Sequence, residues 1–217
     1  MASVRCTSRL VLAAIVLAGG AKASAADAFR ERQLRPVQLD PAALGMAECP
    51  TAGELEAGMV LAVCRTPEAK GEAGVLHLLV VDRSAEDKIL YRSPGAGDSY
   101  YIRPSVFEGE KGGSVVVLAE GGAEFSYGIS VYVIEPGRKV LRAGRIALGG
   151  PGEDGPSSAV PFVQVERSGS AICFRFTHDL VKMKPDGSYA DVPKGKAGFK
   201  YEKGRLAPSK DCAAQGK

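Results

Sequence analysis

The sequence of 217 residues contains no tryptophan, and aromatic residues make up only 6% of it. Proteins that bind nucleic acids usually present a net basic surface and aromatic side chains on which bases stack. The formal net charge of +3 falls to zero when residues 1–26 are removed, because this segment holds three basic residues and no acid. A neutral chain with few aromatic residues matches neither requirement, so we expect no nucleic-acid partner.

Histidine is also scarce, since His77 and His178 are the only two. The sequence has no Cys-x-x-Cys pair, no Gly-x-Ser-x-Gly elbow and no phosphate-binding glycine loop between a strand and a helix. His77 lies in an apolar run, where a hydrogen-bonded core histidine is the common outcome. His178 precedes Asp179, but adjacent strand residues point to opposite faces, so we expect Asp179 to cap a turn. We predict no cofactor, no metal site and no catalytic residue.

The first residues follow the three-part plan of a secretory signal. Arg5 and Arg9 form a positive segment, Leu10 to Leu17 form a short apolar run, and an Ala-x-Ala cleavage pattern follows. A permanent membrane span needs about 20 apolar residues, so this run is too short to be one. A buried N-terminal helix is the alternative, but no polar face recurs at helical period. We predict that residues 1–26 are a signal peptide and that the product is periplasmic or secreted, without stable membrane insertion.

Charge is unevenly spread over the remaining chain. Residues 48–124 hold 13 acids against 7 bases, whereas residues 182–217 hold 9 bases against 4 acids. Such asymmetry is typical of a protein with two differently charged faces or one partner-binding end, but solvated surface charge also produces it. Composition alone leaves both readings open.

Four cysteines remain after residue 26, and an even number in an exported protein predicts two disulfides. They allow three connectivities. We favour Cys49–Cys64 and Cys173–Cys212, because each pair lies at one end of the chain. A metal site is the alternative, but the spacing of cysteine and histidine does not match one.

The rest of the chain consists of short apolar runs separated by turn residues, which is typical of β-strands. Turn sequences at Pro136–Arg138, Ser168–Ser170 and Pro185–Gly187 predict three hairpins. A short helix is expected over 41–47, where Asp40 precedes a proline. We predict a single mainly β domain over 27–217, an antiparallel meander of hairpins arranged as a β-sandwich or a barrel-like sheet, with propeller-like blades as the alternative.

Two further features bear on this fold. Strict alternation places Ile172, Phe174 and Phe176 on one face of a strand and Cys173 on the other. The glycine- and proline-rich stretch from Gly149 to Ser158 is either a long loop or a divider between two sub-units.

One connecting segment, Ala119 to Gly128, carries acidic and aromatic side chains around a double glycine. Loops on a rigid scaffold often carry function, and tyrosine is favoured at binding surfaces. A second aromatic spot occurs shortly before it. We predict a partner-binding set formed by Tyr100, Tyr101, Glu124, Phe125 and Tyr127.

These observations favour an exported, non-enzymatic binding protein that presents loops of a β scaffold to a protein or an envelope component such as a glycan. An inhibitor or immunity-type protein belongs to this class. A first alternative is an envelope hydrolase that uses His178 or paired carboxylates, for which the candidate acids are Glu108, Glu110, Glu120 and Glu124. A second alternative is a structural component of an envelope assembly.

Overall fold

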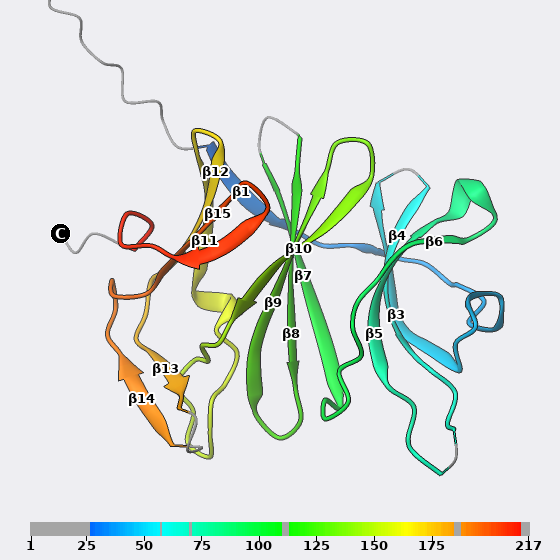
Figure 1. The fold of residues 1–217 in the computed structure, drawn as a ribbon, viewed down its shortest axis with the longest axis horizontal. Helices are drawn as coiled ribbons and strands as arrows, with labels where there is room; N and C mark the ends of the chain where they lie inside the picture. The colour runs from blue at the N-terminus through cyan, green and yellow to red at the C-terminus, as the bar shows by residue number, and fades with distance from the viewer. Residues whose placement is uncertain (1–26, 57, 70, 110–112, 185–187, 214–217) are drawn as a thin grey trace, which may run out of the picture.

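The computed structural model describes residues 27–56, 58–69, 71–109, 113–184 and 188–213 (Figure 1). The predicted signal peptide, residues 1–26, lies outside the described residues. The chain is mainly β, with a nine-stranded antiparallel sheet that is nearly closed into a barrel and a five-stranded antiparallel meander. The predicted fold class is therefore confirmed. No helix within the described ranges is long and apolar enough to cross a membrane.

The five-stranded sheet has the order β2-β3-β4-β5-β6, and its strands follow one another along the chain. Strands β4 and β5 are buried along nearly their whole length, because both faces of the sheet are covered. One face packs against the nine-stranded sheet, and the other packs against the segment around Leu44 and Met46. The strands are β2 (Arg35–Pro36), β3 (Glu48–Glu56), β4 (Met59–Arg65), β5 (Leu76–Asp82) and β6 (Lys88–Arg92).

The nine-stranded sheet has the order β10-β9-β8-β7-β1-β11-β12-β15-β16. Strand β1 pairs with both β7 and β11, and so joins two meanders into one continuous sheet (Figure 1). Propeller blades are separate sheets, so this pairing favours the barrel-like alternative. The strands are β1 (Asp27–Arg32), β7 (Tyr101–Gly109), β8 (Val115–Gly122), β9 (Ser126–Glu135), β10 (Lys139–Ile146), β11 (Val163–Ser168), β12 (Ala171–Phe176), β15 (Gly198–Glu202) and β16 (Arg205–Pro208).

Strands β13 (Leu180–Met183) and β14 (Tyr189–Val192) form a separate two-stranded ribbon, in which Met183 lies opposite Tyr189. The predicted turn of this hairpin, Pro185–Gly187, lies outside the described residues. The other two predicted turns are confirmed, since Pro136–Arg138 joins β9 to β10 and Ser168–Ser170 joins β11 to β12.

The interior of the barrel-like sheet holds the largest apolar cluster. Ile172, Phe174 and Phe176 belong to it, which confirms their predicted shared face. Strand β8 is buried on both faces, because Leu118 points into this cluster while Val117 points toward the five-stranded sheet. The position of β8 between β7 and β9 therefore explains its apolar run from Val115 to Ala119.

The helix predicted over 41–47 is shorter in the structure, where η1 (Ala42–Leu44) is a single 3-10 turn. Its N-cap is Pro41, which makes no side-chain cap hydrogen bond, while the Oδ1 of Asp40, one residue earlier, accepts a hydrogen bond from the backbone N–H of Ala42 at 3.0 Å. Gly45 ends it by adopting φ of +66°, a left-handed conformation that glycine reaches at little cost. The N-cap is therefore one residue later than predicted, and the glycine stops the helix after one turn.

Both predicted disulfides are confirmed. Cys49–Cys64 joins β3 to β4, and Cys173–Cys212 ties the C-terminal segment to the outer face of β12. Disulfides persist in oxidising compartments, so the pair indicates an extracytoplasmic environment.

The stretch from Gly149 to Ser158 is a loop that folds back on itself. Backbone hydrogen bonds of 3.0 Å join Gly150 and Ser157 in both directions. The strands on either side, β10 and β11, belong to the same nine-stranded sheet. The loop therefore connects two strands of one sheet.

Candidate functional site

The five residues of the predicted partner-binding set lie together where β7 begins and where β8 turns into β9. The backbone N–H of Tyr100 donates to the carbonyl of Gly122 at 2.8 Å, and Tyr101 lies opposite Gly122 in the ladder. The start of β7 therefore lies beside the turn that joins β8 to β9. Glu124 and Phe125 form this turn, and the Phe125 ring contacts the Tyr127 ring edge to face at 5.6 Å. We call these residues the aromatic cluster.

Tyr100 is the most accessible member of the aromatic cluster, with 77% of its surface exposed. Glu124 is also exposed, whereas Tyr101, Phe125 and Tyr127 are half-buried. The cluster therefore presents one exposed ring and one exposed carboxylate beside three half-buried aromatic rings. An arrangement of this kind suits contact with a partner, because rigid rings lose little conformational entropy on binding.

Tyr101 lies between charged neighbours. The guanidinium group of Arg103 is 4.3 Å from the centre of the Tyr101 ring. Burial raises the pKa of Tyr101, the Glu120 carboxylate raises it further, and Arg103 opposes the shift. The phenol therefore stays protonated at neutral pH and can donate a hydrogen bond.

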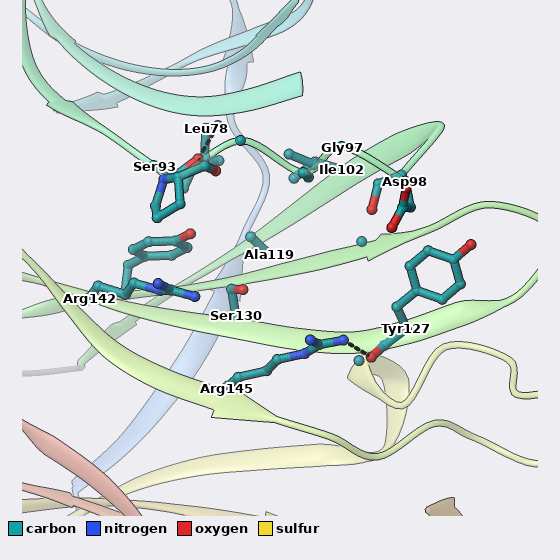
Figure 2. A pocket seen from close by; sticks show the side chains of 17 residues that line it. Leu78, Ser93, Gly97, Asp98, Ile102, Ala119, Tyr127, Ser130, Arg142 and Arg145 are labelled. Carbon is teal, nitrogen blue, oxygen red and sulfur yellow. Dashed lines mark hydrogen bonds between the residues drawn. The ribbon is translucent and has the colours of Figure 1, made fainter. Parts of the chain in front are cut away.

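A pocket of about 260 Å³ adjoins the aromatic cluster, and Tyr127 belongs to both (Figure 2). It lies between the loop 93–99, which follows β6, and the outer face of the β9–β10 hairpin. Its lining combines two arginines, three serines and two tyrosines with a single acid. The polar lining residues are Ser93, Asp98, Ser99, Tyr127, Ser130, Tyr132, Arg142 and Arg145.

A β-bulge places both arginines in this pocket. In the ladder Arg142 lies opposite Tyr132, and Arg145 lies opposite Ser130. Tyr132 and Ser130 are two residues apart in β9 and therefore project from the same face. Residues three apart in a regular strand project from opposite faces, but the bulge between Arg142 and Gly144 adds one residue to β10. Figure 2 shows both guanidinium groups on the side of the hairpin that faces the loop.

The loop 93–99 is held by hydrogen bonds to β5. The Ser93 hydroxyl accepts from the backbone N–H of Leu78 at 2.9 Å and donates to the Pro94 carbonyl at 3.0 Å. The backbone N–H of Ala96 donates to the Leu76 carbonyl at 3.0 Å. The loop thus continues along β5 beyond the end of β6, and forms a fixed wall of the pocket.

The pocket carries net positive charge. Arg145 donates to the carbonyl of Tyr127 and keeps its charge, and Asp98 is the single acid among the described lining residues. Burial raises the pKa of Tyr132 and of Tyr91 behind it, and the positive charge of Arg142 opposes both shifts. Two guanidinium groups beside protonated phenols and serine hydroxyls provide donors for an anionic group.

Neither histidine lies in the pocket lining. His77 is buried, its Nδ1 donates to the Ser93 carbonyl at 2.8 Å, and its Nε2 accepts from Arg92 at 3.2 Å. His77 is therefore a hydrogen-bonded sheet histidine that helps to hold the loop.

The exposed His178 lies 4.6 Å from the Phe162 ring, and its Nδ1 is 2.9 Å from the Thr177 hydroxyl. Asp179 accepts the backbone N–H of Lys194 at 2.7 Å, so it braces a loop and does not orient His178.

The four candidate carboxylates do not line this pocket either. Glu108 forms an ion pair with Arg32, and Glu124 is exposed in the β8–β9 turn. Glu120 is only 3% exposed on the inner face of β8, and its Oε1 has no hydrogen-bond partner among the described residues. Glu110 lies outside the described residues. In the described ranges no group of three or more His, Cys, Asp or Glu residues is placed to hold a metal ion.

Sequence reasoning identified the aromatic cluster but missed Arg142, Arg145 and the loop 93–99. One signal pointed to the arginines, because an isolated glycine such as Gly144 inside a strand pattern indicates a bulge. The loop carried a further signal in Pro94, Gly95 and Gly97, but its position against β9 and β10 depends on packing between the two sheets.

Comparison of the chain with protein-family models, with curated proteins and with solved structures gives no match. Any functional conclusion must therefore come from the geometry of the site.

Proposed function

We propose that this chain is a periplasmic or secreted binding protein without catalytic activity. It presents the aromatic cluster and the adjoining arginine pocket to an acidic group of a protein or an envelope glycan. An inhibitor or immunity-type protein that neutralises an enzyme outside the cytoplasm is one form of this function.

The observation that carries the proposal is the bulged β9–β10 hairpin. It directs Arg142 and Arg145 into one pocket, beside the surface formed by Tyr100, Phe125 and Tyr127. β-Bulges often re-aim side chains next to functional sites. Two guanidinium groups of like charge line one pocket, and an anionic ligand there would be attracted to both. The two disulfides support the extracytoplasmic location, and the signal-like residues 1–26 extend it to the periplasm or the medium.

Replacing both arginines, as Arg142→Ala with Arg145→Ala, is expected to reduce ligand retention by about tenfold or more. Each hydrogen bond to a charged group contributes about 1.5–3 kcal/mol. The measurement is native mass spectrometry of the mature protein, purified gently from the exported fraction without reduction. The matched control is Lys139→Ala, which removes an exposed cation from the opposite end of β10 and should retain the ligand.

Equal retention by the double variant and the control would exclude the arginine pocket as the binding site. A bare protein in every preparation would remove the support for a tightly held partner.

Alanine at all five positions of the aromatic cluster is a separate test. We expect it to weaken retention of the same partner by about tenfold or more, since aromatic anchors carry much of the free energy of binding. Unchanged retention would show that the cluster is not the contact surface, and far-UV circular dichroism would check that the variant is folded.

The envelope hydrolase and the structural component of an envelope assembly remain alternative hypotheses. The hydrolase hypothesis predicts substrate turnover that is lost in His178→Ala or Glu120→Gln. The hypothesis of a structural component predicts a stoichiometric complex that persists in the double arginine variant.

A further inference from the structure

The arginine pocket is the first of three hollows that adjoin along β10. The second, of about 120 Å³, shares Tyr127 and Arg145 with the first, and the third, of about 340 Å³, shares Arg145, Ala147 and Leu148 with the second. We call the three together the β10 groove.

The rim of the β10 groove carries basic residues in its first and third parts. Arg142 and Arg145 line its first part, and Lys182 and Lys196 line its third part. Within the described ranges no ion pair joins any of these four cations to an acid, and Asp98 is the single acid in the lining. Both lysines come from the basic C-terminal part of the sequence. The structure thus places that excess charge beside the two arginines.

The floor of the third hollow is apolar. Leu148 is 7% exposed, and Val192, Phe199 and Leu206 are partly buried against the core of the barrel-like sheet. A ligand that carried only negative charge would use the rim and leave this floor exposed to water. A ligand with apolar groups between its charges would cover both, at about 25 cal/mol per Å² of apolar surface removed from water.

Strand β10 is one end of the nine-stranded order and has no ladder to β16 at the other end among the described residues, but β16 packs against it, since a Cβ on Gly144 would lie 3.1 Å from the Leu206 Cβ. A ligand therefore lies over the hollows and does not extend the sheet. An extended peptide can alternate carboxylates with apolar side chains, whereas an acidic polysaccharide carries few apolar groups to cover the floor. The mixed rim and floor therefore favour a peptide over an acidic polysaccharide.

We propose that the β10 groove binds an extended acidic peptide segment of a partner protein, in which carboxylates alternate with apolar side chains. This inference rests on the proposed function and names its partner class. The carboxylates contact the arginines and lysines of the rim, and the apolar side chains contact Leu148, Phe199 and Leu206.

The probe for this test is a fluorescein-labelled seven-residue peptide of alternating aspartate and leucine with blocked ends, followed by fluorescence anisotropy. Charge reversal at Lys182→Glu with Lys196→Glu is expected to weaken its binding by about tenfold, because two rim attractions become repulsions. The matched control, Lys88→Glu with Lys139→Glu, reverses two exposed cations outside the groove and should change the affinity less than about twofold. An all-aspartate peptide of the same length is expected to bind about tenfold more weakly, because it cannot cover the apolar floor.

Three outcomes would overturn the inference. The first is equal weakening by the groove variant and the control. The second is binding of the all-aspartate peptide, or of a uronic-acid oligosaccharide, as tight as that of the alternating peptide, which would make the groove a general polyanion site. The third is failure of the alternating peptide to bind at about 1 mM. Ligand retention that still depended on Arg142 and Arg145 would in that case uphold the proposed function while excluding a peptide ligand.

Discussion

Phe174→Ala is expected to lower the free energy of unfolding by about 3–5 kcal/mol, the range for a buried phenylalanine replaced by alanine. Phe174 is fully buried in β12, between β11 and β15, and its side chain points into the main apolar cluster. Its removal leaves a cavity in the interior of the barrel-like sheet, and the ladders that join β12 to β11 and to β15 resist its collapse. Since domains are stable by only about 5–15 kcal/mol, this single change removes a large part of the total.

The matched control is Phe125→Ala, which deletes the same ring from the half-buried aromatic cluster. We expect it to cost about 1 kcal/mol, because water already reaches part of that ring. Urea unfolding of the oxidised protein, followed by circular dichroism, gives both values. Equal shifts of the two midpoints would contradict the assignment of Phe174 to the core.

Loss of the second disulfide, in Cys173→Ser with Cys212→Ser, is expected to cost about 4 kcal/mol in the chain-entropy model, because the two cysteines are 39 residues apart. Cys212 is fully buried, and a backbone bond from Ser209 to the Gly198 carbonyl at 2.9 Å holds the same segment. Without the covalent link this segment has few other anchors among the described residues. Hydrogen exchange over residues 209–213 should therefore rise together with the loss of global stability.

The first disulfide provides the comparison. Cys49 and Cys64 are 15 residues apart, so Cys49→Ser with Cys64→Ser should cost about 3 kcal/mol, roughly 1 kcal/mol less. Strands β3 and β4 stay joined by their ladder in that variant, so exchange at the C-terminal segment should not change. Wild-type protein that unfolds at the same urea concentration before and after reduction would refute both estimates.

Local sequence patterns predicted the local structure well. The alternation of Ile172, Phe174 and Phe176 gave the buried face of β12, and turn residues located the hairpin at Pro136–Arg138. Strands β1, β3 and β7 were not predicted. Their sequences carry mixed polar residues such as Arg30 and Glu54, and they become strands because distant partners supply the ladder. Pairing between distant segments leaves little trace in a local pattern.

The sequence likewise predicted one part of the candidate site and not the other. The aromatic cluster was accessible to sequence reasoning because its residues lie in two short segments that β7 and β8 bring side by side. The arginine pocket was not, because it requires the extra residue of the bulge near Ala143 and the packing of the loop 93–99 across the two sheets. A glycine in a strand indicates a bulge but does not say which side chains it turns to which face.

Strand β1 occupies the middle of the nine-stranded sheet although it is the first strand described. Its partners β7 and β11 come much later in the chain, so one of its edges stays unpaired until residue 109 is available and the other until residue 168. Contacts between such distant segments make folding slow, and exposed strand edges are templates for association with other chains. Fragments that end before β11 should therefore self-associate before they can fold, and an intact chain needs protection from its neighbours during that interval.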